Sequence, residues 1–433
     1  MSEQVVGTAT GAERFRRPDG THRVVVTGMG AVTPAGRGVQ ALWDKVMAGE
    51  CCIGEITRFD SSEYPVHIAG EIPGYDPEAF GLTRREAKRI APFVQYAFIA
   101  ADEAMAQAGL DMEAEDATRV GTVFGSGIGG MEDIDRGAVA VHDRGPKKMS
   151  PLFIPTIISN MAAGNLSIRY GLRGACTNVV TACATGSHCI GEATRMIRHG
   201  YLDAALAGGT EESVTTLSIA GFGNLGALTR RPDPKDASKP FDIDRSGFVA
   251  GEGAGAVVLE SMEHAVARGA RIIAEVAGYG STGDAYHMTS PNPSGEGVAR
   301  AMRMALEEGG FAPEDLGHLN AHGTSTPLND KTEATALFEL LGEERGREVP
   351  VVSVKGVTGH MLGGAGAVEA IVTALSVAND CVPPTAGFQT PDPEAPAHVL
   401  TEALTGYRQK VALSNSIGFG GHNASLAFAP YRG

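Results

Sequence analysis

The sequence lacks the features that mark several classes of protein. Its six cysteines include no CxxC pair, which argues against a zinc site and against a disulfide framework. No apolar run reaches the length of a membrane span, and the N-terminus carries no apolar signal core. These absences predict a protein with free thiols, no metal and no membrane association, located in a reducing cytoplasm.

Positive charge is also in short supply. Lysine and arginine number 36 against 51 aspartates and glutamates, so the formal net charge is −15. A molecule with this charge is not drawn to nucleic acid, and an acidic partner must dock on a local basic patch. Hydrophobic residues make up 43% and charged residues 20% of the 433 positions, which is typical of a soluble globular enzyme.

Strand-like apolar segments recur in the same order in two parts of the chain. In the first part they lie at residues 23–28, 119–125, 178–183, 203–209 and 253–260. In the second part they lie at residues 271–278, 318–323, 349–355, 410–415 and 423–429. Helical patterns between them lie at residues 92–108, 296–309 and 330–342. The shared order predicts two similar α/β halves whose strands are covered on both faces.

The predicted domain organisation follows this division. Residues 1–22 are polar, contain glycine and arginine, and predict a flexible leader. Residues 23–265 are the predicted N-terminal half and residues 266–433 the C-terminal half. Three segments rich in glycine, proline and charge predict long loops that contact a substrate or partner: 131–152, 212–250 and 281–296.

Cys183 lies where a strand pattern changes into a helix pattern. Val179, Val180 and Thr181 before it are β-branched, whereas many residues after it are small and Gly200 favours a helix stop. A cysteine at such a turn lies beside unpaired N–H groups at the positive end of the helix, which favours the nucleophilic thiolate. The alternative is a buried apolar cysteine, a common environment for this residue.

Two histidines follow neighbouring predicted strands of the second half. His322 ends the strand at 318–323 in a polar turn, and His360 follows the strand at 349–355. Ligand chemistry favours the carboxyl ends of strands in α/β sheets, so a thiolate and two imidazoles there form a catalytic set. The alternatives are structural histidines or metal ligands, although no third ligand is apparent.

Three glycine-rich turns also follow strands. Residues 28–36 and 125–130 resemble dinucleotide loops, but neither lies in a convincing βαβ unit with its acidic residue, so nucleotide binding is disfavoured. Residues 415–423 form a glycine-dense turn between two strands. Its backbone N–H groups either face a developing oxyanion or belong to a simple hairpin.

Several long motifs resemble, in order, those of the β-ketoacyl-acyl-carrier-protein synthases. Four are Thr181-Ala-Cys-Ala-Thr-Gly, Asn320-Ala-His-Gly-Thr-Ser-Thr-Pro, Val354-Lys-Gly-Val-Thr-Gly-His and Asn415-Ser-Ile-Gly-Phe-Gly-Gly-His-Asn. Two more are Phe241-Asp-Ile-Asp-Arg-Ser-Gly-Phe-Val and Asp284-Ala-Tyr-His-Met-Thr-Ser-Pro. The resemblance covers the chain from about residue 23 onward and is strongest toward the elongating synthase II of fatty acid synthesis. It implies the thiolase fold, a five-layered αβαβα sandwich of two similar halves, and a homodimer with the active site near the interface.

The resemblance also implies a reaction, with no cofactor and no metal. Cys183 takes the acyl group from an acyl-carrier thioester; malonyl-carrier protein then loses carbon dioxide, and its enolate attacks the acyl-cysteine. His322 and His360 stabilise the developing negative charge as neutral N–H donors. Lys355 favours the thiolate and orients the histidines. The backbone N–H groups of Cys183 and Phe419 form the oxyanion hole.

Further positions match the family's supporting and binding residues. The supporting acidic positions are Asp330, Glu333 and Glu369. Thr324 and Thr326 match contacts to the carrier's pantetheine arm, and Ile128 matches a residue that lines the acyl pocket across the dimer interface. The positions that face acidic carrier proteins are Arg85, Lys88, Arg89, Lys147 and Lys148. The alternatives are a solvated helix residue for Glu333, interface packing for Ile128 and ordinary surface charge for the basic residues.

Related subclasses differ at identifiable positions. Thiolases carry a second reactive cysteine where this chain has residues 415–423, and initiating synthases have asparagine where His360 stands. The alternative that shares the cysteine and both histidines is the ketosynthase catalytic subunit of a type II polyketide synthase. Ser187-His-Cys189 and Ile417 depart from the commonest family pattern, and both bear on acyl-chain preference.

Overall fold

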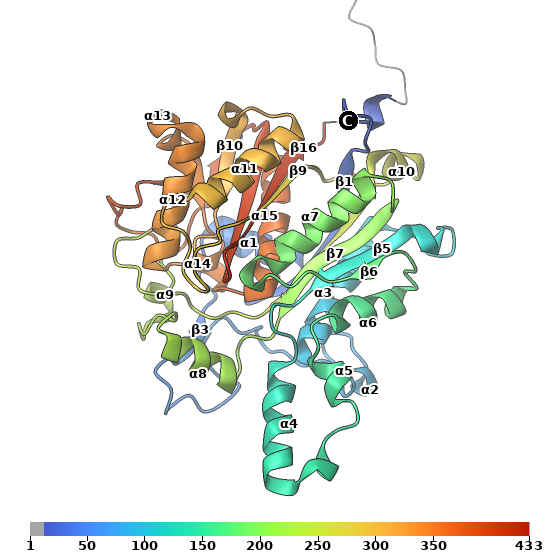
Figure 1. Ribbon diagram of the computed structural model, residues 1–433, viewed down its shortest axis with the longest axis vertical. Helices are drawn as coiled ribbons and strands as arrows, with labels where there is room; N and C mark the ends of the chain where they lie inside the picture. Colours follow the sequence, from blue (N-terminus) through green and yellow to red (C-terminus); the bar gives the residue numbers. More distant parts are fainter. Residues whose placement is uncertain (1–12, 433) are drawn as a thin grey trace, which may run out of the picture.

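The two halves of the chain build the same arrangement of strands (Figure 1), in a computed structural model that describes residues 13–432. In spatial order, the first half has β1 (Val24–Thr33), β8 (Gly253–Ser261), β7 (Ala204–Glu211), β5 (Val120–Gly125) and β6 (Cys176–Thr177). The second half has β9 (Ala274–Gly283), β16 (His422–Pro430), β15 (Val411–Gly418), β10 (Leu316–Asn320), β11 (Pro350–Val352) and β13 (His398–Val399). In each half the first three strands pair antiparallel and the later ones parallel.

Helices complete the five layers. Between the two sheets, α7 (Thr185–Arg198) and α15 (Ala365–Ala378) contact each other and strands of both halves. The outer face of the first sheet is covered by α3 (Pro92–Ala108) and that of the second by α11 (Glu296–Gly309), beside which α12 (Pro327–Leu341) packs. The sheets meet through a short pairing of β1 with β9. The order of layers is the αβαβα sandwich that the sequence predicts.

Glycines let the outer helix of each half approach its sheet. A Cβ on Gly30 would lie 1.9 Å from the carbonyl oxygen of Ala100 in α3. A Cβ on Gly280 would lie equally close, 1.9 Å, to the carbonyl oxygen of Ala301 in α11. No side chain fits at either place. Because Gly30 lies within β1, the first glycine-rich turn is a packing surface rather than a dinucleotide loop.

Shorter elements surround this frame. The remaining helices are α1 (Val39–Ala48), α2 (Arg84–Ala87), α4 (Met131–Arg144), α5 (Phe153–Ile157), α6 (Met161–Tyr170), α8 (Thr216–Leu225), α9 (Pro234–Ala237), α10 (Met262–Ala267), α13 (Glu343–Gly346) and α14 (Lys355–Thr358). The remaining strands are β2 (Gly36–Arg37), β3 (Gly54–Glu55), β4 (Ile68–Ala69), β12 (Cys381–Val382) and β14 (Leu404–Thr405). Within residues 13–432 no helix combines the length and the apolar character needed to cross a membrane.

Three local predictions are wrong. Residues 178–183 form no strand: the two residues of β6 precede them, and a 3₁₀ turn lies at Ala182–Ala184. The loop expected at 131–152 contains α4, and the one at 212–250 contains α8 and α9. The segment of α4 is rich in charged residues and packs against α5, α8 and the 3₁₀ turn Pro146–Lys148, so its composition resembles that of a loop.

The described part of the predicted flexible leader is packed onto the body. Residue 16 forms a β-bridge with residue 22, and Phe15 packs against a cluster that includes Met262. The guanidinium of Arg17 donates to the carbonyl oxygen of Ala277 at 2.9 Å. Residues 13–22 of the predicted leader are thus in contact with the body, and its first 12 residues lie outside the described part of the chain.

Candidate active site

Cys183 lies at a strained turn where the chain enters α7. The residue before it, Ala182, has a φ of 51°, a left-handed conformation that a side chain disfavours, so the turn is held by its surroundings. Gly186 allows a close approach between helices, because a Cβ there would lie 2.7 Å from the backbone nitrogen of Ala367 in α15. Cys183 is 7% exposed as a result. The predicted elbow is present, although little strand precedes it.

His322 and His360 face each other beside this thiol. His322 follows β10 and His360 follows α14, and their ring centroids lie 5.2 Å apart at an interplanar angle of 83°. The Cys183 sulfur and one nitrogen of each ring all lie within 4.8 Å of one another. The structure thus brings together three residues that are far apart in sequence, as the catalytic-set interpretation requires.

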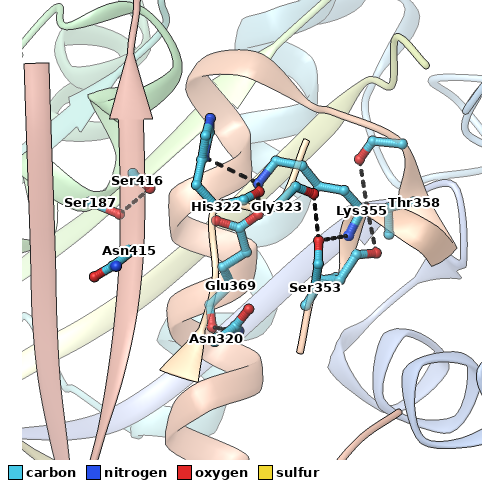
Figure 2. Close-up of polar contacts among 12 residues, drawn as sticks. Ser187, Asn320, His322, Gly323, Ser353, Lys355, Thr358, Glu369, Asn415 and Ser416 are labelled. Atoms are coloured by element: carbon cyan, nitrogen blue, oxygen red, sulfur yellow. Dashed lines mark hydrogen bonds and ion pairs between the residues drawn. The ribbon is translucent and has the colours of Figure 1, made fainter. Parts of the chain in front are cut away.

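Lys355 fixes the orientation of His322, as Figure 2 shows. Its ammonium lies 3.3 Å from Nδ1 of His322, donates to the carbonyl oxygen of His322 at 2.5 Å and pairs with the buried carboxylate of Glu369. An ammonium has no lone pair, so Nδ1 of His322 must accept and the ring proton must reside on Nε2. His322 is therefore held as a donor toward the cleft.

Burial keeps both imidazoles neutral. It lowers the pKa of His322 and the pKa of His360 well below the usual value, and the Lys355 ammonium lowers both further. Both ring nitrogens of His360 have no hydrogen-bond partner among the described residues, so this ring is free to donate and to accept. Two neutral imidazoles are the state predicted for stabilising an oxyanion.

The resting thiol differs from the prediction. Burial raises the pKa of Cys183 to about 12, although Lys355 and the backbone N–H groups of Phe419 and Cys183 itself lower it. For the pKa of this thiol, desolvation outweighs the helix-end and lysine effects, whereas the sequence led us to expect that the turn favours the thiolate. The same two N–H groups are those predicted for the oxyanion hole. Gly418 lets the hairpin of β15 and β16 approach the turn at Cys183, because a Cβ on Gly418 would lie 2.4 Å from the Thr181 carbonyl oxygen.

Two of the three predicted acidic supports accept hydrogen bonds from backbone N–H groups, and Asp330 also lies 3.7 Å from the Arg245 guanidinium. Glu333 accepts the N–H groups of His322 and Gly323 at 2.8 and 2.9 Å, and burial raises its pKa to about 7. Asp330 accepts the N–H of Phe241 at 2.8 Å. All three acids are at most 2% exposed, so the interpretation of Glu333 as a solvated helix residue is wrong.

A cleft of about 370 Å³ leads to the thiol and the two imidazoles. Thr324 and Thr326 line it, and their hydroxyl groups hydrogen-bond at 2.9 Å. Its apolar walls include Phe222, Phe248 and Leu362. The ring of Phe248 meets that of His360 edge-on at 5.2 Å. The cleft is thus apolar beside the histidines, with two hydroxyl groups along one wall.

The remaining predicted residues lie farther out. Ile128 is half-buried rather than buried in this single chain, and it packs on the apolar cluster that contains Cys183. The predicted docking residues are all exposed, and they lie on or beside α2 and on the 3₁₀ turn Pro146–Lys148. Lys88 and Lys148 line the same cleft of about 600 Å³, so the two basic segments are neighbours.

Sequence reasoning missed Glu211, Gly363, Phe248 and Leu362. Glu211 is a buried carboxylate at the end of β7, and two consecutive glutamates after an apolar strand were the signal that could have marked it. Phe248 stands inside a quoted motif but carries no chemistry of its own. The roles of Gly363 and Leu362 depend on backbone geometry that residue type does not reveal.

The spacing of Cys183, His322 and His360 would also suit a metal ion. The cysteine supplies the third ligand that was not apparent in the sequence. However, the Lys355 ammonium lies 3.3 Å from His322 Nδ1, and its positive charge opposes a cation between the rings. The arrangement favours anion stabilisation over cation binding.

A thiol with two neutral imidazoles, set between the halves of a thiolase-like sandwich, defines an acyl-transferring enzyme. The model described as "Beta-ketoacyl synthase, N-terminal domain" matches residues 21–265, and "Beta-ketoacyl synthase, C-terminal domain" matches residues 273–389. The chain belongs to the β-ketoacyl synthase family.

Individual relatives indicate which subclass of the family the chain resembles. The chain is 46% identical over 409 residues to 3-oxoacyl-[acyl-carrier-protein] synthase 2 of Staphylococcus aureus strain COL, covering 94% of this chain and 98% of that protein. It is 46% identical over 411 residues to the protein of the same name from Vibrio cholerae, covering 94% and 98%. A solved type II polyketide ketosynthase in complex with its acyl-carrier protein superposes with a TM-score of 0.87 at 32% identity, covering 95% of this chain and 100% of that one.

Proposed function

We propose that the protein catalyses the decarboxylative condensation of an acyl group with malonyl-acyl-carrier protein, giving 3-oxoacyl-acyl-carrier protein in fatty acid elongation. The observation that carries the proposal is the buried set of Cys183, His322 and His360 within 4.8 Å. The names of the 46%-identical relatives agree with this reaction.

The first step transfers the acyl group to Cys183. Because the thiol is neutral at rest, its proton must leave as the sulfur attacks the thioester carbonyl. His360 has both ring nitrogens unpartnered in the described structure and can carry that proton to the departing pantetheine sulfur. The backbone N–H groups of Cys183 and Phe419 receive the carbonyl oxygen as it becomes negative. The acyl-cysteine and a free carrier thiol result.

The second step uses both histidines as donors. The malonyl carboxylate leaves as carbon dioxide, and its bonding electrons form an enolate on the thioester oxygen. His322 Nε2–H and His360 donate to that oxygen in a site from which water is largely excluded. The enolate carbon then attacks the acyl-cysteine carbonyl and the carbon–sulfur bond breaks. The departing Cys183 thiolate takes a proton from solvent. Lys355 and Glu333 act through His322, by fixing its ring and its backbone.

The test is turnover by the purified protein alone. The protein is incubated with malonyl-carrier and with acyl-carriers of two to sixteen carbons, and the carrier products are identified by mass spectrometry. We expect 3-oxoacyl-carrier two carbons longer than the acyl donor, with one carbon dioxide released per product. Acylation without condensation, or turnover only when a second homologous subunit is added, would contradict the proposal.

The second candidate is the ketosynthase subunit of a type II polyketide synthase. It is favoured by the superposition on such a ketosynthase with its carrier protein. Sequence identity is lower there, 32% against 46% for the fatty acid synthases, so elongation remains the main proposal. A product extended by several unreduced two-carbon units in the incubation above would favour this alternative.

We further propose that an acyl carrier protein docks on the cleft between α2 and the 3₁₀ turn Pro146–Lys148. Arg85, Lys88, Arg89, Lys147 and Lys148 are exposed there on a molecule whose net charge is −15. Reversing Arg85 and Lys88 to glutamate should raise KM for carrier-bound substrate about tenfold and weaken its salt dependence. Reversing the exposed Arg300 on α11 is the control. An unchanged salt dependence would remove the carrier from this face.

We also propose that the protein is a homodimer, that it is located in the cytoplasm, and that residues 23–265 and 266–433 form its two similar halves. β6 is the last strand at its end of the sheet, and near it along the chain Ile154, Ile158 and Val180 are 58%, 40% and 48% exposed. An open strand edge with exposed apolar side chains favours pairing with a second copy. All six cysteines are free, which fits a reducing compartment. A monomer by sedimentation at micromolar concentration would contradict the dimer.

A further inference from the structure

Glu211, the last residue of β7, is a buried carboxylate that the proposed chemistry does not use. It is 1% exposed, and its two oxygens accept four hydrogen bonds. One oxygen accepts from the Ser126 hydroxyl at 2.6 Å and the Ile128 N–H at 3.2 Å. The other accepts from the N–H groups of Gly127 at 2.8 Å and Gly363 at 3.0 Å. Three of these donors are backbone groups, which need an acceptor once they are buried.

These donors come from two turns in different halves of the molecule. Residues 126–130, the acyl-pocket turn, follow β5 and carry Ile128. Residues 360–364, the histidine turn, carry His360 and lead into α15. The turns also touch directly, because a Cβ on Gly363 would lie 2.5 Å from the backbone nitrogen of Gly127 and 2.7 Å from Glu211 itself. Glu211 therefore occupies the junction between the acyl pocket and a catalytic imidazole.

The four donors favour the charged form of this side chain. They lower its pKa, but burial raises it more, so the pKa of Glu211 lies above its usual value. Each oxygen already accepts two hydrogen bonds, so a proton on either one would displace a donor that has no other partner. The negative charge reaches the nucleophile as well, since Glu211 raises the pKa of the Cys183 thiol.

We infer that Glu211 is a positioning residue that fixes the acyl-pocket turn to the histidine turn, so that one side chain sets the geometry of both acylation and decarboxylation. The inference rests on the proposed function and deepens it. A change at Ile128 alone should affect only how fast different acyl chains are transferred to Cys183. A change at His360 alone should not alter the order of those rates. Glu211 contacts both turns, so its loss must change both properties together.

The test is Glu211→Gln, which keeps the size of the side chain but turns one acceptor oxygen into an NH₂ donor facing N–H groups. We expect condensation to fall about 10- to 100-fold, the usual effect of misplacing reacting groups by about 1 Å. Acylation of Cys183 by two-, six- and twelve-carbon pantetheine thioesters should lose its wild-type order of rates. Malonyl-carrier decarboxylation, measured in a Cys183→Gln background, should fall as well.

Three variants serve as comparisons. Glu212→Gln removes the adjacent buried carboxylate, which accepts from the N–H groups of Phe93 and Glu132 and touches neither turn; it should keep the order of acyl chains. Glu211→Asp keeps the charge at shorter reach and should recover part of both activities. Ser126→Ala removes one donor to Glu211 together with the acceptor of the Gly129 N–H. It should give the same pattern at about threefold, which keeps the test available if Glu211→Gln does not fold.

The outcomes separate this inference from the proposed function. If the wild-type protein yields no 3-oxoacyl product, the proposed function fails and the inference with it. If the wild type condenses but Glu211→Gln keeps the rates and chain order of the wild type, the inference alone is wrong. A loss that follows only the folded fraction, with unchanged rates per acylatable Cys183, would likewise reduce Glu211 to a structural residue.

Discussion

The two halves of the molecule build the same turn and use it differently. Before α7, Ala182 has a φ of 51° and starts a 3₁₀ turn, and before α15, Leu362 has a φ of 43° and starts another. Both helices then run for 14 residues. The residue that follows the left-handed one is Cys183 in the first turn and Gly363 in the second. The strained turn is thus a shared scaffold, and what differs is the atom it presents: a sulfur to the cleft, or a backbone N–H to Glu211.

The strand ends show the same division of labour. In the first half, β5 leads into the apolar Ile128, whereas in the second half the equivalent β10 leads into His322. The first half therefore supplies the nucleophile, and Ile128 packs on the apolar cluster that contains it. The second half supplies both imidazoles, Lys355 and the two threonines of the cleft. The same arrangement of strands thus positions the thiol in one half and the two imidazoles in the other.

Replacing the nucleophile gives the largest expected effect. Cys183→Gln should lower condensation at least about a thousandfold, because no acyl-enzyme can form. Malonyl decarboxylation should remain measurable, since both imidazoles stay in place. Its rate should be level from pH 6 to 8, because both histidines have pKa values well below 6.5 and stay neutral there. Carbon dioxide release across this pH range is the measurement, and a rate that changes in step with a group titrating near pH 6.5 would contradict it.

Much of this asymmetry could be predicted from residues alone. The repeated strand order predicted two similar halves, and helices at 92–108 and 296–309 lie at those positions in the structure because their apolar spacing is regular. Cys183, His322 and His360 carry distinctive chemistry, so residue type and motif were enough to select them. The four-residue helix α2 and the 14-residue α4 gave no such signal.

What could not be predicted depends on burial and on backbone geometry. The thiol pKa depends on how completely Cys183 is desolvated, and a helix-start argument contains no information on that. Glu211 was missed because its partners are backbone N–H groups from segments distant in sequence. Leu362 and Ala182 gave no sign of their left-handed conformation, because packing rather than residue preference imposes it.

We expect the next largest effect from breaking the buried ion pair between Lys355 and Glu369 in the second half. Lys355→Met leaves the Glu369 carboxylate buried without its counter-ion, which should cost about 3–5 kcal/mol of unfolding free energy. The double variant Lys355→Met with Glu369→Gln should recover most of that stability. Decarboxylation should not recover, because Nδ1 of His322 is no longer held as an acceptor. Urea unfolding and carbon dioxide release test the two parts, and recovery of both would assign Lys355 a stabilising role only.

The second turn should not tolerate a side chain at Gly363, although the first turn carries one at Cys183. Gly363→Ala places a Cβ 2.5 Å from the backbone nitrogen of Gly127, so the free energy of unfolding should fall by about 1–3 kcal/mol. Gly221→Ala in α8 is the matched control: its Cβ would meet nothing within 4 Å, and it should gain up to about 1 kcal/mol as an exposed helix position. Equal effects of the two substitutions in thermal unfolding would show that the second turn tolerates a side chain as the first one does.

The smallest effect tests whether the first half alone selects the acyl chain. Ile128 is half-buried on the apolar cluster that contains Cys183, and enlarging it to phenylalanine adds volume beside the nucleophile. Overpacking of this kind costs about 1–3 kcal/mol, a penalty that should fall on long acyl chains and spare acetyl. Acylation of Cys183 by twelve-carbon relative to two-carbon carriers should therefore drop about tenfold, since 1.4 kcal/mol corresponds to that ratio. Decarboxylation in the Cys183→Gln background should not change, because the histidines belong to the other half. A proportional loss at two, six and twelve carbons would mean that Ile128 contributes to packing alone, and that the division of labour between the halves does not extend to chain length.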